Sequence, residues 1–303
     1  AQAIAAVFGI LQQHPDHSDA LYMLAVAQRY GGQARHAQET LDRLLTLNPD
    51  FGRAYQECGH LYREIPDMDR ALHAYVQACQ CNPALTASWR AQAEIRRERG
   101  QSRAAEIAAA QADRLAALPK ELLAVSHYLH EGKLLKAEKL CRAFLQKHPK
   151  DTEAMRLLAD VACRYGVMEE AEFLLDSAIA FAPENIQLRL DFIEVLRKRQ
   201  KFRDALAQAK LLYDREPDNP VFQSHYAIES LQAGEYDQAL SLFDQILEAL
   251  PDDPATLTSR GHALKTLGHQ AEAIASYRRV FDKTPGHGDA WYALANLKTY
   301  AFS

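Results

Sequence analysis

Prolines recur along this chain at a constant spacing. They occupy positions 15, 49, 83, 149, 183, 217, 251 and 285, which lie 34 residues apart except between Pro83 and Pro149. A period near 34 is typical of helix-turn-helix units that stack into a solenoid, because each unit buries its apolar face only against its neighbours. The interval from Pro83 to Pro149 is 66 residues, two short of two periods, so one junction between units is expected to differ from the rest.

Other residues recur in phase with these prolines. An alanine stands twelve residues before each proline, and Ala105 fills the same place in the unit that lacks one. A small side chain is needed where two helices of a hairpin cross closely, since a larger one would overpack the contact by about 1–3 kcal/mol. Glycines at the turn between the two helices permit the left-handed backbone that ends the first helix. They are Gly32, Gly100, Gly132, Gly166, Gly234 and Gly268, and Pro66 replaces one of them.

This pattern resembles the tetratricopeptide repeat family. The stretch from 254 to 287, PATLTSRGHALKTLGHQAEAIASYRRVFDKTPGH, carries Gly261, Gly268, Ala273 and Pro285 at places that mark that family. The resemblance implies an all-α, right-handed superhelical solenoid. We expect one solenoid over 1–303, with eight full repeats that start at 18, 52, 86, 118, 152, 186, 220 and 254 and a half repeat at each end. An irregular junction is expected near 113–120.

Composition narrows the class of function. Hydrophobic residues make up 48% of the chain and charged residues 25%, values typical of globular proteins. The sequence has no run of about 18 apolar residues to cross a membrane. A formal net charge of −5 argues against a nucleic-acid-binding solenoid, which needs a basic surface. Five cysteines include Cys79 and Cys81, whose side chains diverge on an expected helix, so we predict free thiols and a cytoplasmic protein.

Catalytic chemistry is not indicated. The sequence has no glycine-rich phosphate loop, no GxSxG and no CxxC pair. His127 and His130 lie three residues apart and could share a metal ion, but no third ligand has a suitable spacing. We therefore expect no catalytic residue, no metal and no cofactor in this chain, and a role in binding other proteins.

In a solenoid of this type the first helix of each repeat lines the concave side, which is the default binding surface. Positions 5, 9, 12 and 13 of the full repeats sample that surface and carry nine basic and five acidic residues. The basic residues are Arg29, Arg63, Arg90, Arg97, Arg156, Arg164, Arg197, Lys198 and Lys265, and the acidic residues are Glu64, Glu94, Glu98, Asp160 and Glu194.

Arg29, Arg63 and Arg97 occupy the same position in three successive repeats. A line of guanidinium groups suits forked contacts with carboxylates or phosphates, so one interpretation is a groove for a protein or peptide with an acidic segment. The alternative is that these arginines pair with neighbouring carboxylates of the chain. The sequence leaves both open.

The last residues carry a further resemblance. "GHALKTLG" (261–268), "EAIASYRRVF" (272–281) and "GDAWYALANLKTYAFS" (288–303) together resemble the end of the repeat region of bacterial sulfotransferases that contain these repeats. The resemblance implies a partner- or substrate-recruiting scaffold beside a domain that uses 3′-phosphoadenosine-5′-phosphosulfate. The alternative is a free-standing adaptor or assembly protein.

A final expectation concerns residues 288–300. They place Trp291, Leu294 and Leu297 at helical spacing, so one side of this helix is expected to pack on the preceding repeat. The other side carries few polar residues. We expect the chain to continue past Ser303 into a helix that covers Leu294, Leu297 and Tyr300, and this chain to self-associate or fray through that end.

Overall fold

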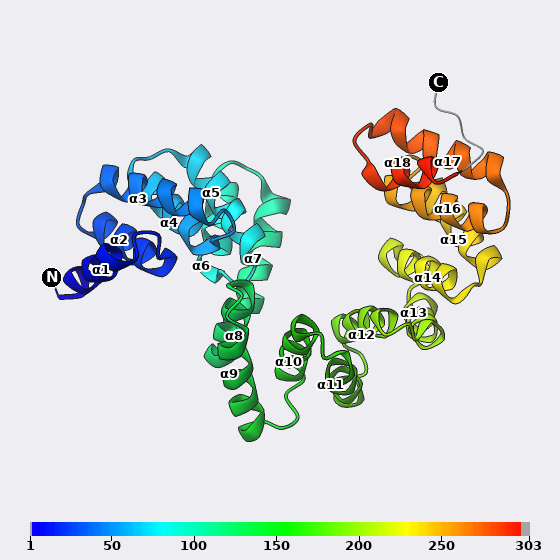
Figure 1. Ribbon diagram of the computed structural model, residues 1–303, viewed down its shortest axis with the longest axis horizontal. Coiled ribbons are helices and arrows are strands. Elements are labelled where there is room, and N and C mark those ends of the chain that lie inside the picture. Colours follow the sequence, from blue (N-terminus) through cyan, green and yellow to red (C-terminus); the bar gives the residue numbers. More distant parts are fainter. Residues whose placement is uncertain (1, 298–303) are drawn as a thin grey trace. The chain divides into compact units, whose positions relative to one another are not determined.

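The computed structural model describes residues 2–297, and over that range every regular element is an α-helix (Figure 1). The predicted all-α class is confirmed. Side chains are described from Val7 onward. The chain divides into two compact units, 1–161 and 162–303, and each is described by itself. Their union in one continuous solenoid stays a prediction.

Helices of the first unit pair into hairpins of about one repeat each. They are α1 (Gln2–Gln13), α2 (Ser18–Tyr30), α3 (Ala34–Leu47), α4 (Gly52–Glu64), α5 (Met68–Cys81), α6 (Thr86–Glu98), α7 (Ser102–Ala116), α8 (Lys120–His130) and α9 (Leu134–Lys147). Helix α10 (Thr152–Tyr165) contains the boundary between the units.

The second unit continues the pattern. Its helices are α11 (Met168–Phe181), α12 (Ile186–Lys198), α13 (Phe202–Arg215), α14 (Pro220–Ala233), α15 (Tyr236–Ala249), α16 (Pro254–Thr266), α17 (Gln270–Lys283) and α18 (Gly288–Ala295). None of the described helices is long and apolar enough to cross a membrane.

The junction between α7 and α8 differs from the others. It contains only residues 117–119, whereas the other loops between successive hairpins contain four residues. Pro119 is the N-cap of α8, and a proline disfavours helical backbone at the residue before it. Helix α8 therefore begins at Lys120, two residues after the predicted start of that repeat, and it has only 11 residues.

Close packing within the hairpins follows the small residues. A Cβ added to Gly59 would lie 2.5 Å from the ring of Tyr75, and one added to Gly261 would lie 2.4 Å from the ring of Tyr277. In the first full repeat the corresponding positions hold Ala25 and Leu41, which are buried in one core cluster. From Val7 onward the recurrent alanines of the second helices are buried: Ala37, Ala71, Ala105, Ala137, Ala171, Ala205, Ala239 and Ala273.

Left-handed backbone occurs at the predicted turns. Gly32, Gly100, Gly132, Gly166, Gly234 and Gly268 all have positive φ angles, between 68° and 88°. The repeat that starts at Ile186 has Gln200 at this place, and Gln200 takes the same conformation with φ 60°. A side chain is disfavoured there, so Gln200 strains the turn.

The expectation for the C-terminal helix was wrong for Leu294 and Leu297. Leu294 and Leu297 are 1% and 4% exposed and belong to one core cluster with Leu257, so they are not left open for a following helix. Trp291 stacks on Phe281 of α17, so it packs on the preceding repeat as expected, and it is 42% exposed. Tyr300 lies outside the described residues.

The five cysteines are free thiols. Cys58, Cys79 and Cys141 are buried, while Cys81 and Cys163 are half-buried. Burial raises the pKa of Cys58, Cys79 and Cys141 to about 12, so these thiols stay protonated and serve as small core side chains.

Candidate functional site

Two of the three arginines predicted to form a line of guanidinium groups, Arg29 and Arg63, pair with carboxylates of the chain itself. Arg29 places Nε 2.8 Å from Oε2 of Glu57 and Nη1 2.7 Å from Oε1 of Glu64. Burial opposes its charge, but these two carboxylates raise the pKa of Arg29. Arg63 Nη1 lies 3.1 Å from Oε2 of Glu94. Arg97 is exposed and makes no ion pair with the rest of the described chain.

The other predicted cations divide in the same way. Arg156, Arg197 and Lys198 pair with carboxylates of Glu153, Glu229 and Glu194 at 2.7, 3.1 and 2.6 Å, respectively. Arg164 is exposed and has a contact of its own. Arg90 and Lys265 have no carboxylate partner within residues 2–297. Internal pairing thus describes five of the nine cations, and binding of an external anion stays a prediction.

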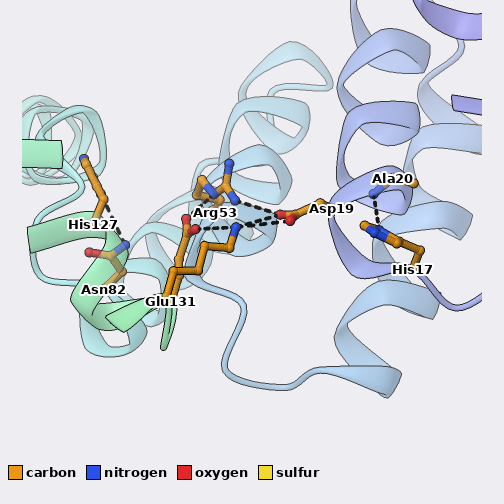
Figure 2. Close-up of polar contacts among 8 residues, drawn as sticks. His17, Asp19, Ala20, Arg53, Asn82, His127 and Glu131 are labelled. Atoms are coloured by element: carbon orange, nitrogen blue, oxygen red, sulfur yellow. Dashed lines mark hydrogen bonds and ion pairs between the residues drawn. The ribbon is translucent and has the colours of Figure 1, made fainter. Parts of the chain in front are cut away.

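A ring of four alternating charges lies elsewhere in the first unit, where the α8–α9 turn meets α2 and α4 (Figure 2). Arg53 reaches Asp19 at 3.1 Å and Glu131 at 2.6 Å. Lys133 reaches Asp19 at 3.1 Å and Glu131 at 2.8 Å. We call these four residues the charge ring. It joins positions 114 residues apart in the sequence.

Local structure explains the placement of the two charges on the first helices. The Nδ1 atom of His17 accepts a hydrogen bond from the backbone N–H of Ala20 and so caps α2, which puts Asp19 in the first turn, where the helix dipole favours an anion. The Arg53 guanidinium lies 4.7 Å from the centre of the Tyr22 ring and 5.2 Å from that of Phe51. These aromatic contacts hold the guanidinium in place.

Titration of the ring members follows their contacts. Partial burial would raise the pKa of Asp19, but the ammonium of Lys133 and the guanidinium of Arg53 hold it below its usual value. Burial would likewise lower the pKa of Lys133, and its hydrogen bonds with Glu131 and Asp19 raise it instead. These shifts indicate that Asp19 and Lys133 are charged at neutral pH.

A second polar contact joins α8 to the loop before α6. Nδ2 of Asn82 lies 3.3 Å from Nδ1 of His127 (Figure 2). Oδ1 of Asn82 accepts a hydrogen bond from the backbone N–H of Ala84. Burial lowers the pKa of His127. The described residues contain no group of three side chains able to hold a metal ion, and the proposed pairing of His127 with His130 on a metal gains no third ligand.

Two cavities meet at the charge ring. The larger has a volume of about 740 Å³ and we call it the groove. The smaller has a volume of about 350 Å³ and lies at the loops before α4 and α6. Both include Asp19, Arg53, Glu131 and Lys133 in their walls. The groove is completed by Tyr22, Met23, Gln56, Leu85, Thr86, Ala87, Leu123, Ala124, His127, Tyr128 and Lys136.

The chemistry of the groove is that of a binding site. Its walls are mostly apolar, with Met23 52% exposed, and its polar end is the charge ring. Lys136 is exposed and places Nζ 6.0 Å from the centre of the Tyr128 ring. Apolar walls with a few fixed polar groups bind extended peptides and small ligands.

Sequence reasoning missed most of the groove. Of the four repeat positions sampled, position 5 supplies Tyr22 and Gln56, but Arg29, Arg63 and Arg97 lie at the far ends of their helices and do not line it. Asp19 and Arg53 both occupy position 2 of their repeats. Opposite charges at the same position of neighbouring repeats could have indicated the ion pair between Asp19 and Arg53. The contact of Asp19 with Lys133 has no such pattern in the sequence.

Comparison with protein families agrees with the fold. Models described as tetratricopeptide repeat match residues 19–50, 128–190, 196–260 and 258–297. The chain belongs to the tetratricopeptide repeat family. The matches concern the repeats, and the resemblance to the repeat region of sulfotransferases stays a prediction.

Individual relatives are distant. Cellulose synthase operon protein C of Pseudomonas fluorescens strain SBW25 is 27% identical over 191 residues, which cover 60% of this chain and 15% of that protein. This chain therefore matches only a small part of that relative's length.

Solved structures resemble the chain in fold. MamA residues 41 to the end, from Desulfovibrio magneticus RS-1, has a TM-score of 0.51 at 11% identity and covers 56% of this chain and 99% of its own. YrrB, described as a repeat protein with an unusual peptide-binding site, has a TM-score of 0.48 at 16% identity and covers 74% of this chain and 98% of its own. At these identities the MamA likeness shows the fold alone.

Proposed function

We propose that this chain is a protein-binding scaffold that holds an extended peptide segment of a partner in the groove of its first unit. The observation that carries the proposal is the groove itself, about 740 Å³ bounded by α2, α4, α6 and α8. Its size suits a few peptide residues rather than a folded domain.

The groove offers both kinds of contact that a peptide needs. Tyr22, Met23 and Tyr128 provide apolar surface for a side chain to bury, at roughly 25 cal/mol per Å². Gln56 of α4 and Thr86 of α6 add polar atoms to the groove lining, where a peptide backbone can hydrogen-bond. An apolar side chain of the partner is therefore the expected anchor.

An acidic residue beside that anchor is the second part of the proposal. Lys136 is a cation at the groove without a carboxylate partner in the described chain. Arg90 and Arg97 on α6 are also exposed and unpaired there, but they do not line the groove. A carboxylate of the partner would meet Lys136 near the surface, where charge adds mainly to the association rate and to specificity.

Panning the full chain against a phage library of random peptides of about twelve residues tests the proposal. Enriched peptides are then measured by fluorescence anisotropy. Met23→Lys places a charge in the groove and is expected to weaken binding at least about tenfold. Ile107→Lys is the matched control, because Ile107 is an exposed apolar residue of α7 outside the groove. Failure to enrich any peptide, or equal loss in both variants, would contradict the proposal.

A second proposal concerns what the scaffold serves. The resemblance of 261–303 to the repeat region of sulfotransferases supports recruitment of a partner or substrate to an attached sulfotransferase domain, and a free-standing adaptor is the alternative. The gene sequence after Ser303 decides between them. The five free thiols suit the reducing conditions of a cytoplasm.

Self-association through the C-terminal end remains part of this proposal in a revised form. Among the described residues of that end, the exposed large apolar side chains are Trp291 and Tyr292, whereas Leu294 and Leu297 are buried. Analytical ultracentrifugation of the chain and of a Trp291→Gln variant tests it, and a monomer at all concentrations would remove it.

A further inference from the structure

The α8–α9 hairpin, residues 120–147, completes the groove from one side. Leu123, Ala124, His127 and Tyr128 of α8 form that wall. The turn between its helices carries two members of the charge ring: Glu131, which contacts Arg53 of α4, and Lys133, which contacts Asp19 of α2. The groove therefore exists only while this hairpin is seated against α2 and α4.

The connection that leads into this hairpin is short and exposed. Residues 117–119 form it, and Ala117 and Pro119 are exposed. The backbone N–H of Leu118 bonds the carbonyl of Leu115, and that of Leu123 bonds the carbonyl of Pro119, so each helix ends on its own bonds. A short loop between two complete helices is the usual form of a hinge.

The charge ring is built to hold the seated position. Each of its four charges lies between two opposite charges, at 2.6 to 3.1 Å. Glu131 is only 15% exposed at its side chain, and Arg53 and Lys133 are below one third exposed. A partly buried network of this kind is stronger than the exposed helix pairs elsewhere in the chain, yet it is still weakened by salt.

We propose that the α8–α9 hairpin is a strap that closes over the bound segment and is latched by the charge ring. This inference rests on the proposed function for its purpose, since the strap needs an occupant of the groove. The latch itself is a property of the chain alone. It is reversible because its bonds are between side chains that water and salt can reach.

Hydrogen exchange of the chain without any peptide tests the latch. Lys133→Gln removes two ion pairs of the ring, and residues 120–130 and the first turn of α2 are expected to exchange about tenfold faster. Lys210→Gln is the matched control, because it removes the exposed pair with Asp214 on α13 and the same charge. Lys133→Arg keeps the charge and is expected to keep the protection.

Salt gives an independent measure in the wild type. Raising the ionic strength to about 1 M is expected to speed exchange of residues 120–130 as Lys133→Gln does, and to have little further effect in that variant. Adding Asp19→Asn to Lys133→Gln is expected to change exchange less than the sum of the two single effects. Unchanged exchange in Lys133→Gln, or an equal rise in Lys210→Gln, would overturn the latch.

Peptide binding separates the strap from the groove. For a peptide selected on the wild type, Lys133→Gln is expected to raise the dissociation rate about tenfold and to leave the association rate within about threefold. An unchanged dissociation rate would overturn the strap while the groove proposal stands. Loss of binding in Met23→Lys with an intact latch by hydrogen exchange would support both.

Discussion

The hairpins α4–α5 and α16–α17 pack in the same way and differ in their surface residues. In α4–α5, Gly59 receives the ring of Tyr75, whose hydroxyl lies 2.8 Å from Nδ1 of His60. In α16–α17, Gly261 receives the ring of Tyr277, whose hydroxyl lies 3.0 Å from the same atom of His262. The two histidine rings meet their tyrosines edge to face in both hairpins.

The second residue of each first helix separates the two hairpins. It is Arg53 in α4, a member of the charge ring, and Ala255 in α16. The fifth residue is Gln56, in the groove wall, against Thr258, whose hydroxyl donates to its own helix at the carbonyl of Pro254. The comparison teaches that the repeating positions build the hairpin, while the positions that do not repeat build the site.

The largest expected effect tests whether the shared packing is equally tight. Gly59→Ala and Gly261→Ala each place a Cβ within 2.5 Å of a tyrosine ring carbon, so each is expected to lower the free energy of unfolding by about 2 kcal/mol. Urea unfolding followed by circular dichroism measures both. A loss in only one variant would show that the two hairpins are not packed alike.

A compensating change sharpens this test. Ala25 and Leu41 occupy these two positions in the first full repeat and are both buried. Combining Gly59→Ala with Tyr75→Leu recreates that pairing, so the double variant is expected to recover part of the stability that Gly59→Ala loses. No recovery would mean that the alanine is excluded by something other than the ring.

A smaller effect on stability is expected at the turn between the two helices of a hairpin. The two compared hairpins have Pro66 and Gly268 at this turn, and neither residue is strained there. Gln200 has φ 60° in α12–α13, so Gln200→Gly is expected to raise the free energy of unfolding by about 1 kcal/mol. Gly234→Gln is the converse and is expected to lower it by a similar amount. Thermal unfolding measures both, and a loss in Gln200→Gly would contradict the strain.

The smallest expected effect is on pH dependence, and it compares the two histidines. Burial lowers the pKa of His60 and of His262. At His60 the carboxylate of Glu57 opposes this shift and Arg29 adds to it, and at His262 Lys265 adds to it. The neutral form is thus favoured in the folded state, while the unfolded chain takes up a proton below about pH 6.5. Stability is therefore expected to fall as pH is lowered from about 7.5 to about 5.5.

Variants assign this dependence. His60→Gln and His262→Gln keep an acceptor for the tyrosine hydroxyl and remove the titration, so each is expected to flatten the pH dependence by a similar amount. Burial also lowers the pKa values of His127 and His225, so these two histidines are expected to account for the pH dependence that the variants keep. Urea unfolding at several pH values measures the free energy of unfolding of each variant. A different pH dependence in the two variants would show that the two histidines do not contribute equally.

The fold was predictable because its determinants repeat. Each alanine and glycine that recurs with the prolines answers a local steric need. The interval from Pro83 to Pro149, which is two residues short, contains the three-residue junction 117–119. The site was not predictable because the charge ring joins Asp19 to Lys133 across 114 residues, which no local pattern records. Arg29 drew attention by position, yet Glu57 beneath it already neutralises its charge.

The central claim is that a partner segment lies in the groove of the first unit. A crystal structure of the chain with a peptide enriched by panning tests it most directly. We predict peptide density between α2, α4, α6 and α8, with an apolar side chain against Met23 and Tyr128. Density on another surface, with the groove empty, would contradict it.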